Sequence, residues 1–163
     1  MRLAAVPKQL CGCRRLRVLL PILAALLAAC APAPAPKPPP DPVTEDWYGP
    51  VTAQLAAMNR DAEGLLRDGK GDRAAAVITK GQVLASRLLA APRPTLGAME
   101  AASDLDRMYA DMLLGNQNYG WARLAYQKNA SRWKNWRPQT AETARRLKLA
   151  RDGIAECDRR MGQ

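Results

Sequence analysis

The sequence predicts an all-α protein, a small antiparallel bundle of about five helices arranged as paired helical hairpins. Three observations favour this fold class. Alanine is abundant, runs of alternating β-branched residues are almost absent, and apolar residues recur three or four positions apart in five segments. The composition favours helix over strand, and the spacing gives each helix one apolar face for a core. Because the connections between segments are short, neighbouring helices should run antiparallel.

Helix-breaking and capping residues bound the first three segments. The first helix is expected over residues 45–68, and Gly69-Lys70-Gly71 ends it. Asp72 has the side chain of an N-cap for the second helix, which Pro92-Arg93-Pro94 ends. Thr95 is the expected N-cap of the third helix.

The two remaining helices follow breaks of the same kind. The third helix should stop at residues 115–118, and a fourth should run from about Tyr119 to Asn135, before Pro138. The fifth helix reaches the carboxy terminus. Its apolar face includes Cys157, and arginine and lysine residues occupy its other face.

A weak repeat connects two of these helices. Ala76 and Ala122 each lie sixteen residues before a proline, Pro92 and Pro138, and the two pairs are 46 residues apart. The pattern somewhat resembles the second helix of a tetratricopeptide-type hairpin. Its spacing exceeds the 34-residue period of that family, and the family's signature residues are mostly absent. A plain up-and-down bundle with an extra helix is the alternative.

The amino terminus has the three parts of a secretory signal peptide. Its charged residues up to position 29 are all basic, and a short apolar run from Val18 to Ala29 ends in small residues. That run is about a dozen residues long, whereas a helix that spans a bilayer needs roughly 20. The basic residues are Arg2, Lys8, Arg14, Arg15 and Arg17.

The residues that follow resemble the lipobox of bacterial lipoproteins. They are Leu27-Ala28-Ala29-Cys30. The resemblance implies cleavage before Cys30, attachment of diacylglycerol to its thiol and further acylation of the new amino terminus, which together hold a protein stably on a membrane. Residue 31 is Ala31 and not aspartate. The resemblance therefore implies a cell-envelope protein on the outer membrane, facing the periplasm.

A proline-rich tether separates this anchor from the helices. Residues 31–42 alternate alanine and proline and then run through Lys37 and further prolines. Such a segment forms a semi-rigid polyproline II spacer, with a reach on the order of 35–40 Å. A ligand for a proline-recognising domain is the alternative. The expected organisation is a signal peptide over residues 1–29, a lipidated linker over 30–44 and a helical domain over 45–163.

Charge is distributed unevenly along the chain. Cleavage removes five basic residues and lowers the net charge from +10 to +5. Residues 41–118 contain eight basic and eleven acidic residues, a net of −3, whereas residues 119–163 contain eleven and four, a net of +7. A basic half favours anionic partners, which in an envelope are lipid head groups, cell-wall polymer or acidic proteins rather than nucleic acid.

The residue types offer little for catalysis. The chain has no histidine, the commonest general base and transition-metal ligand, so we expect no metal and no cofactor. With Cys30 acylated, Cys157 is left either as a buried apolar residue or as the link in a disulfide-bonded dimer. Asp104 and Asp111 lie on one helical face and Asp106 on another. A glycosidase-like acid pair or an ordinary solvated face are the two interpretations.

The segment from Tyr126 to Arg137 interleaves aromatic and basic residues. Such a pattern suits phosphate contacts, sugar stacking or a membrane interface, and a core tryptophan beneath basic side chains is the alternative. We expect a non-catalytic lipoprotein whose helical domain binds an envelope protein or an anionic wall or lipid surface. A carboxylate-dependent cell-wall hydrolase and a structural spacer are the alternatives. The candidate binding face consists of Lys128, Arg132, Lys134, Trp136, Arg137, Arg145 and Arg146.

Overall fold

The computed structural model describes residues 40–162, and the domain begins at Pro40. The predicted signal peptide, Cys30 and most of the proline-rich tether lie outside the described residues. A short 3-10 helix, η1 (Pro42–Thr44), opens the domain, and its Val43 packs against the helical core. The described structure therefore includes a helical turn a few residues before position 45, where the sequence placed the start of the domain.

Five α-helices follow η1, and residues 40–162 contain no strand. The all-α fold predicted from the sequence is confirmed, and each observed helix lies within a few residues of its expected segment. The helices are α2 (Tyr48–Arg67), α3 (Gly71–Leu89), α4 (Leu96–Gly115), α5 (Tyr119–Asn135) and α6 (Ala141–Met161).

Threonine side chains cap two of the helices. The Thr95 hydroxyl accepts a hydrogen bond of 3.3 Å from a backbone N–H in the first turn of α4, as predicted. Before α6, the Thr140 hydroxyl accepts from the backbone of Thr143 at 3.2 Å, and the Thr143 hydroxyl accepts from the backbone of Thr140 at 2.8 Å. These reciprocal bonds satisfy backbone donors that the first helical turn leaves unpaired.

The predicted cap of α3 is wrong. Asp72 lies inside the first turn, and Lys70 occupies the N-cap position without a side-chain bond. Gly69 adopts a left-handed conformation (φ +72°), which shortens the turn after α2 and starts α3 at Gly71. Asp72 still favours the helix, because its negative charge lies near the positive end of the helix dipole.

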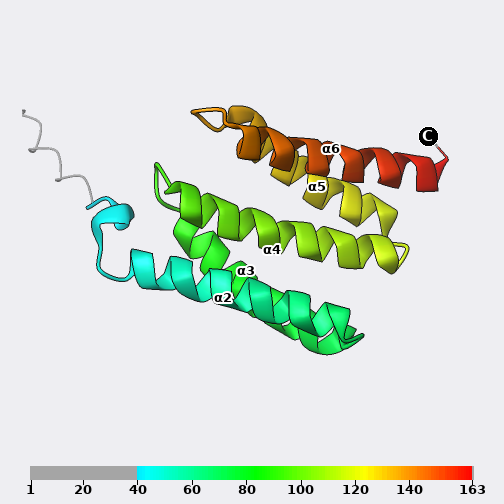
Figure 1. Ribbon diagram of the computed structural model, residues 1–163, viewed down its shortest axis with the longest axis horizontal. Coiled ribbons are helices and arrows are strands. Elements are labelled where there is room, and N and C mark those ends of the chain that lie inside the picture. Colours follow the sequence, from blue (N-terminus) through cyan, green and yellow to red (C-terminus); the bar gives the residue numbers. More distant parts are fainter. Residues whose placement is uncertain (1–39, 163) are drawn as a thin grey trace, which may run out of the picture. The chain divides into compact units, whose positions relative to one another are not determined.

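The helices form two layers (Figure 1). Helices α2, α4 and α6 lie side by side in one layer, while α3 lies behind α2 and α4, and α5 behind α4 and α6. Helix α4 is central and packs against α2, α3 and α5, whereas α6 packs mainly against α5. Helices that are consecutive in the chain therefore alternate between layers, which decides which charged residues share a face.

Two apolar clusters hold the layers together. The larger joins α2, α3 and α4 through Leu55, Ile78 and Leu105, and the smaller joins α4, α5 and α6 around Tyr126 and Cys157. Each of these side chains is buried. The full burial of Cys157 agrees with its interpretation as a core residue.

Candidate functional site

The two layers differ strongly in charge. Helices α3 and α5 contain seven basic residues and one acidic residue, Asp72, a net of +6. Helices α2, α4 and α6 contain nine basic and ten acidic residues, a net of −1. The basic residues of the α3 and α5 layer are Arg73, Lys80, Arg87, Arg123, Lys128, Arg132 and Lys134.

A hollow of about 710 Å³ lies where the turn between α3 and α4 meets the end of α5. We call it the basic hollow. It has apolar walls and four cationic side chains, and none of its lining residues is aspartate or glutamate. The lining residues are Pro92, Arg93, Pro94, Met99, Lys128, Ser131, Arg132, Asn135, Trp136 and Arg137.

The cations of the basic hollow fall into two groups. Arg132 lies 2.5 Å from the carboxylate of buried Asp106, and Lys128 lies 3.4 Å from the same group. Arg137 donates to the backbone carbonyls of residues 134 and 136, and within residues 40–162 neither it nor Arg93 pairs with a carboxylate. Arg93 and Arg137 are exposed, so their charges remain available to an anionic group.

Trp136 connects the hollow to the core. Its ring meets that of Trp133 edge to face, with 6.3 Å between centroids, and Trp133 is fully buried. The indole N–H of Trp133 donates to the Ser103 hydroxyl at 2.7 Å. These contacts hold one aromatic wall of the hollow in place.

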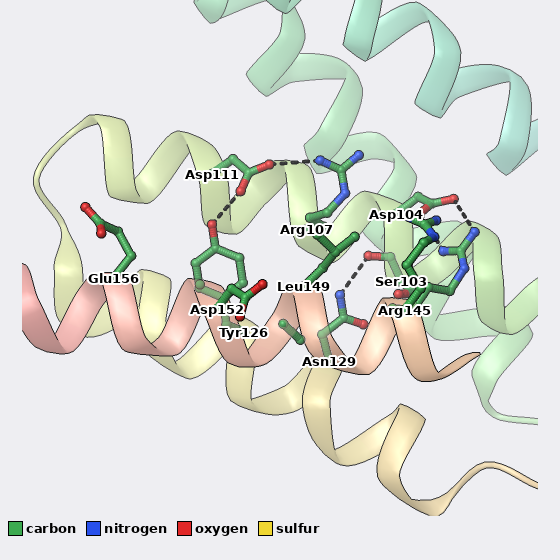
Figure 2. A pocket seen from close by; sticks show the side chains of 13 residues that line it. Ser103, Asp104, Arg107, Asp111, Tyr126, Asn129, Arg145, Leu149, Asp152 and Glu156 are labelled. Carbon is green, nitrogen blue, oxygen red and sulfur yellow. Dashed lines mark hydrogen bonds and ion pairs between the residues drawn. The ribbon is translucent and has the colours of Figure 1, made fainter. Parts of the chain in front are cut away.

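The structure divides the predicted binding face. Lys128, Arg132, Trp136 and Arg137 line the basic hollow, and Lys134 is exposed on the same helix, α5. Arg145 and Arg146 instead line a separate charged groove of about 500 Å³ between α4 and α6, with α5 contributing to its wall (Figure 2). This division follows from the alternation of layers, because α5 and α6 belong to different ones.

Arg146 is the central cation of the charged groove. Its guanidinium lies 2.6 Å from Asp104 and 2.8 Å from Glu142, and it sits 5.5 Å from the ring centre of Trp133. Only 14% of the side chain is exposed. Burial disfavours its charge, but the hydrogen bond and charge of Asp104 outweigh that effect and raise the pKa of Arg146. The sequence placed Arg146 on a solvent face, whereas it holds α6 against α4.

The other end of the groove contains a chain of hydrogen bonds across three helices. Figure 2 shows Tyr126 reaching from α5 to Asp111 on α4, and its hydroxyl donates to that carboxylate. Arg107 donates to Asp111 at 3.0 Å and to Glu63 of α2 at 3.1 Å. Burial and the bond to Asp111 raise the pKa of Tyr126, so this hydroxyl is a permanent donor. Gly153 of α6 lies directly against the tyrosine ring.

The carboxylates considered as an acid pair are each bonded to an arginine. Asp104 and Asp111 both line the charged groove, where Arg146 and Arg107 bind them. Asp106 lies on the other side of α4, as predicted, but it is buried rather than solvated. Asp104 links α4 to α6 through Arg146, and Asp111 links α4 to α5 through Tyr126, so the carboxylates act as links between helices and provide no observation in favour of a hydrolase.

Sequence reasoning missed a set of buried polar residues that position the site. The Asn129 amide donates to the backbone carbonyl of Ser103 at 3.0 Å, and the Asn59 amide donates to that of Ala101 at 2.7 Å. The side chains of Asn59, Ser103 and Asn129 are all buried. A signal was available, since Asn59 and Asn129 fall at core spacing within apolar stripes, at 55, 59 and 62 and at 126, 129 and 133.

Within residues 40–162, no three histidine, cysteine or acidic side chains gather closely enough to hold a metal ion. None of the helices from α2 to α6 is long and apolar enough to cross a bilayer.

Comparison with known proteins finds nothing similar, since no family model, no curated protein and no solved structure matches the chain.

Proposed function

We propose that this chain is a bacterial lipoprotein, held on a membrane through Cys30, whose helical domain binds an anionic partner in the cell envelope without catalysing a reaction. The observation that carries the binding part is the basic hollow. Four cationic side chains and one tryptophan surround it, and no carboxylate lines it.

The anchor is supported by the sequence alone. The signal peptide and the lipobox at residues 27–30 provide a route to acylation of Cys30. Replacement of Cys30 by alanine should abolish incorporation of labelled fatty acid and stop processing of the precursor. Unchanged fatty-acid labelling of the variant would contradict the proposed anchor.

The proposed binding role rests on cationic side chains that have no anionic partner within the described domain. Arg93 and Arg137 have no carboxylate partner in the described domain, and the Lys128 and Arg132 charges next to them share a single buried aspartate. A phosphate or carboxylate group in the hollow would gain charge-assisted hydrogen bonds from guanidinium groups that already point towards solvent. Such a partner also fits the net +6 of the surrounding layer.

Paired charge reversals test this role. Purified full-length protein in detergent should bind isolated cell-wall polymer, poly-glutamate or micelles doped with phosphatidylglycerol. The Arg93→Glu/Arg137→Glu variant should bind at least about ten-fold more weakly, since two charge-assisted contacts become repulsive. The matched control is Arg67→Glu/Arg151→Glu, which changes net charge equally at exposed positions on α2 and α6. Equal losses in the two variants, or no binding to any probe, would reject the basic hollow.

A further inference from the structure

The layer formed by α3 and α5 carries the most exposed apolar side chains of the described domain. Val83 on α3 and Trp121 on α5 are each 69% exposed, and Leu124 on α5 is 54% exposed. In α3 the buried positions are 74, 78, 81, 85 and 88, so Val83 lies on the opposite side of that helix. Large apolar groups directed away from a core in this way indicate a contact surface when they gather on one face.

Two of these side chains, Trp121 and Leu124, adjoin the basic hollow. Three hollows follow one another along α5 over α4, and Lys128 lines all three. Trp121 and Leu124 line the hollow furthest from Trp136, together with Tyr109 of α4. Residues 121–136 cover about 22 Å along a helix. The apolar patch of Trp121, Leu124 and Tyr109 and the basic hollow therefore form one continuous surface, which we call the outer face.

Positive charge accompanies the apolar groups on this face. Lys128 is exposed and lines all three hollows, and Arg93 and Arg137 are exposed in the hollow that contains Trp136. Within α3 and α5 the one carboxylate is Asp72, in the first turn of α3, and Asp106 of α4, which lines the other two hollows, is paired with Arg132. Tryptophan and leucine among lysines and arginines suit the head-group region of a bilayer, where rings and alkyl groups enter the interface and cations meet phosphate.

We infer that the outer face docks on the anionic phospholipid bilayer that carries the acyl anchor, so that the domain lies against the membrane. The inference rests on the proposed lipidation of Cys30. The nine residues between Cys30 and Pro40 reach at most about 30 Å, which keeps the domain continuously close to that bilayer. The opposite layer has a net charge of −1. Charge complementarity therefore selects which side turns towards the lipid.

Quenching of tryptophan emission by brominated lipid tests this contact. Full-length acylated protein would be reconstituted into vesicles of phosphatidylcholine alone or mixed with phosphatidylglycerol, with brominated phosphatidylcholine as the quencher in both. Wild-type emission should be quenched strongly in the phosphatidylglycerol vesicles and only weakly without that lipid. Trp121→Phe should lose most of the quenched emission, because the exposed indole is the group placed in the interface.

Two leucine variants provide a matched pair. Leu124→Glu adds a carboxylate to the outer face, and Leu149→Glu makes the same change on α6, where the leucine is 41% exposed. Leu124→Glu should reduce the docked fraction about ten-fold, since it removes an apolar contact and adds a repelled charge. Leu149→Glu should retain wild-type quenching. Leu124 and Leu149 are both exposed, so both variants should fold, and far-UV circular dichroism of each variant would check this.

Flotation of the vesicles separates the two proposals. Protein that floats without quenching retains its anchor and overturns the docking. Equal loss in the two leucine variants, or equal quenching without phosphatidylglycerol, overturns it as well. Binding of poly-glutamate without quenching would assign the outer face to an acidic protein. Failure to float at all would reject the anchor, and the docking with it.

Discussion

The ion pair beneath the basic hollow should be worth far more to folding than an exposed pair of similar length. The carboxylate of Asp106 lies 2.5 Å from Arg132, and their side chains are only 9% and 13% exposed. Removal of one partner from a buried pair typically costs about 3–5 kcal/mol. Arg132 also lines the basic hollow and can turn towards water there, so we expect the Asp106→Ala variant to lose only about 2–3 kcal/mol, at or just below the lower limit of that range.

An exposed pair provides the control for this variant. Lys148 and Asp152 are 2.7 Å apart, but their side chains are 75% and 56% exposed. Asp152→Ala should therefore lose less than about 1 kcal/mol. Urea unfolding followed by circular dichroism gives both values. The apolar double variant Asp106→Leu/Arg132→Met should recover most of the loss, because no charge is left uncompensated. If Asp106→Ala comes within 1 kcal/mol of Asp152→Ala, the buried pair is not structural and this reasoning fails.

Three further outcomes are expected. Gly153→Ala should destabilise the domain by about 1–3 kcal/mol in thermal unfolding, because the added Cβ would lie 2.6 Å from the Tyr126 ring. Gly64→Ala is the control and should stabilise the domain by about 0.5–1 kcal/mol, because its Cβ would meet nothing within 4 Å. The opposite order of stabilities would refute the close packing of Gly153 against Tyr126. Cys157, buried and with a raised thiol pKa, should react with maleimide only at denaturant concentrations that unfold the domain, and rapid labelling of the native protein would contradict its core position. Hydrogen bonding from Arg145, with the charge of Arg146 adding, lowers the pKa of Glu142 from 4.5 to about 2, so its stabilisation is complete above pH 4.5 and is lost as the pH falls towards 2. The Glu142 side chain is 44% exposed, so in Glu142→Gln the free energy of unfolding that is lost on acidification should be smaller by only about 0.2–1 kcal/mol. If the stability of the variant and of the wild type depends on pH in the same way, the ion pairs of Glu142 contribute nothing.

The helices were predictable because their signals are local. Apolar spacing within α2 to α6 and the prolines and glycines between them depend on residues that are neighbours in the chain. Thr95 shows this well, since the hydroxyl that caps α4 bonds to a backbone N–H three residues later. Asp72 shows the limit. Its capping role depended on where the preceding turn closes, and the turn at Gly69 places the N-cap at Lys70, two residues earlier than expected.

The composition of the site depended on packing partners that no local pattern identifies. Arg146 reads as a surface residue of an amphipathic helix, yet it is largely covered because Asp104 and Trp133 lie opposite it. Trp121 of α5 shows the reverse, since it is a large aromatic residue but is 69% exposed. Asn129 occupies a core position because a backbone carbonyl of α4 is within reach. Each outcome was decided by a neighbouring helix.

The charge of a chain half is a poor guide to a binding face, because ion pairs within a helix can cancel it. Residues 119–163 have a net charge of +7, which pointed to α5 and α6 together. Helix α6 compensates much of its own charge, because Glu142, Asp152 and Glu156 each pair with a basic residue three or four positions away. Helix α5 contains no acidic residue at all. Its charge can be compensated only from outside the helix, and among residues 40–162 the one carboxylate within 4 Å of Lys128 and Arg132 is Asp106.

The positive charge of α5 is therefore left largely uncompensated along the surface that this helix shares with α3. Helix α5 shares its layer with α3, which is also basic, and the turn that carries Arg93 lies at the end of the groove between them. Alternation of the helices between layers brings these cations together, although they are far apart in the sequence, and directs Leu124 outward beside them. An anionic partner that meets this surface gains both the charge and the apolar contact. A partner that meets α6 finds arginines already bound to carboxylates.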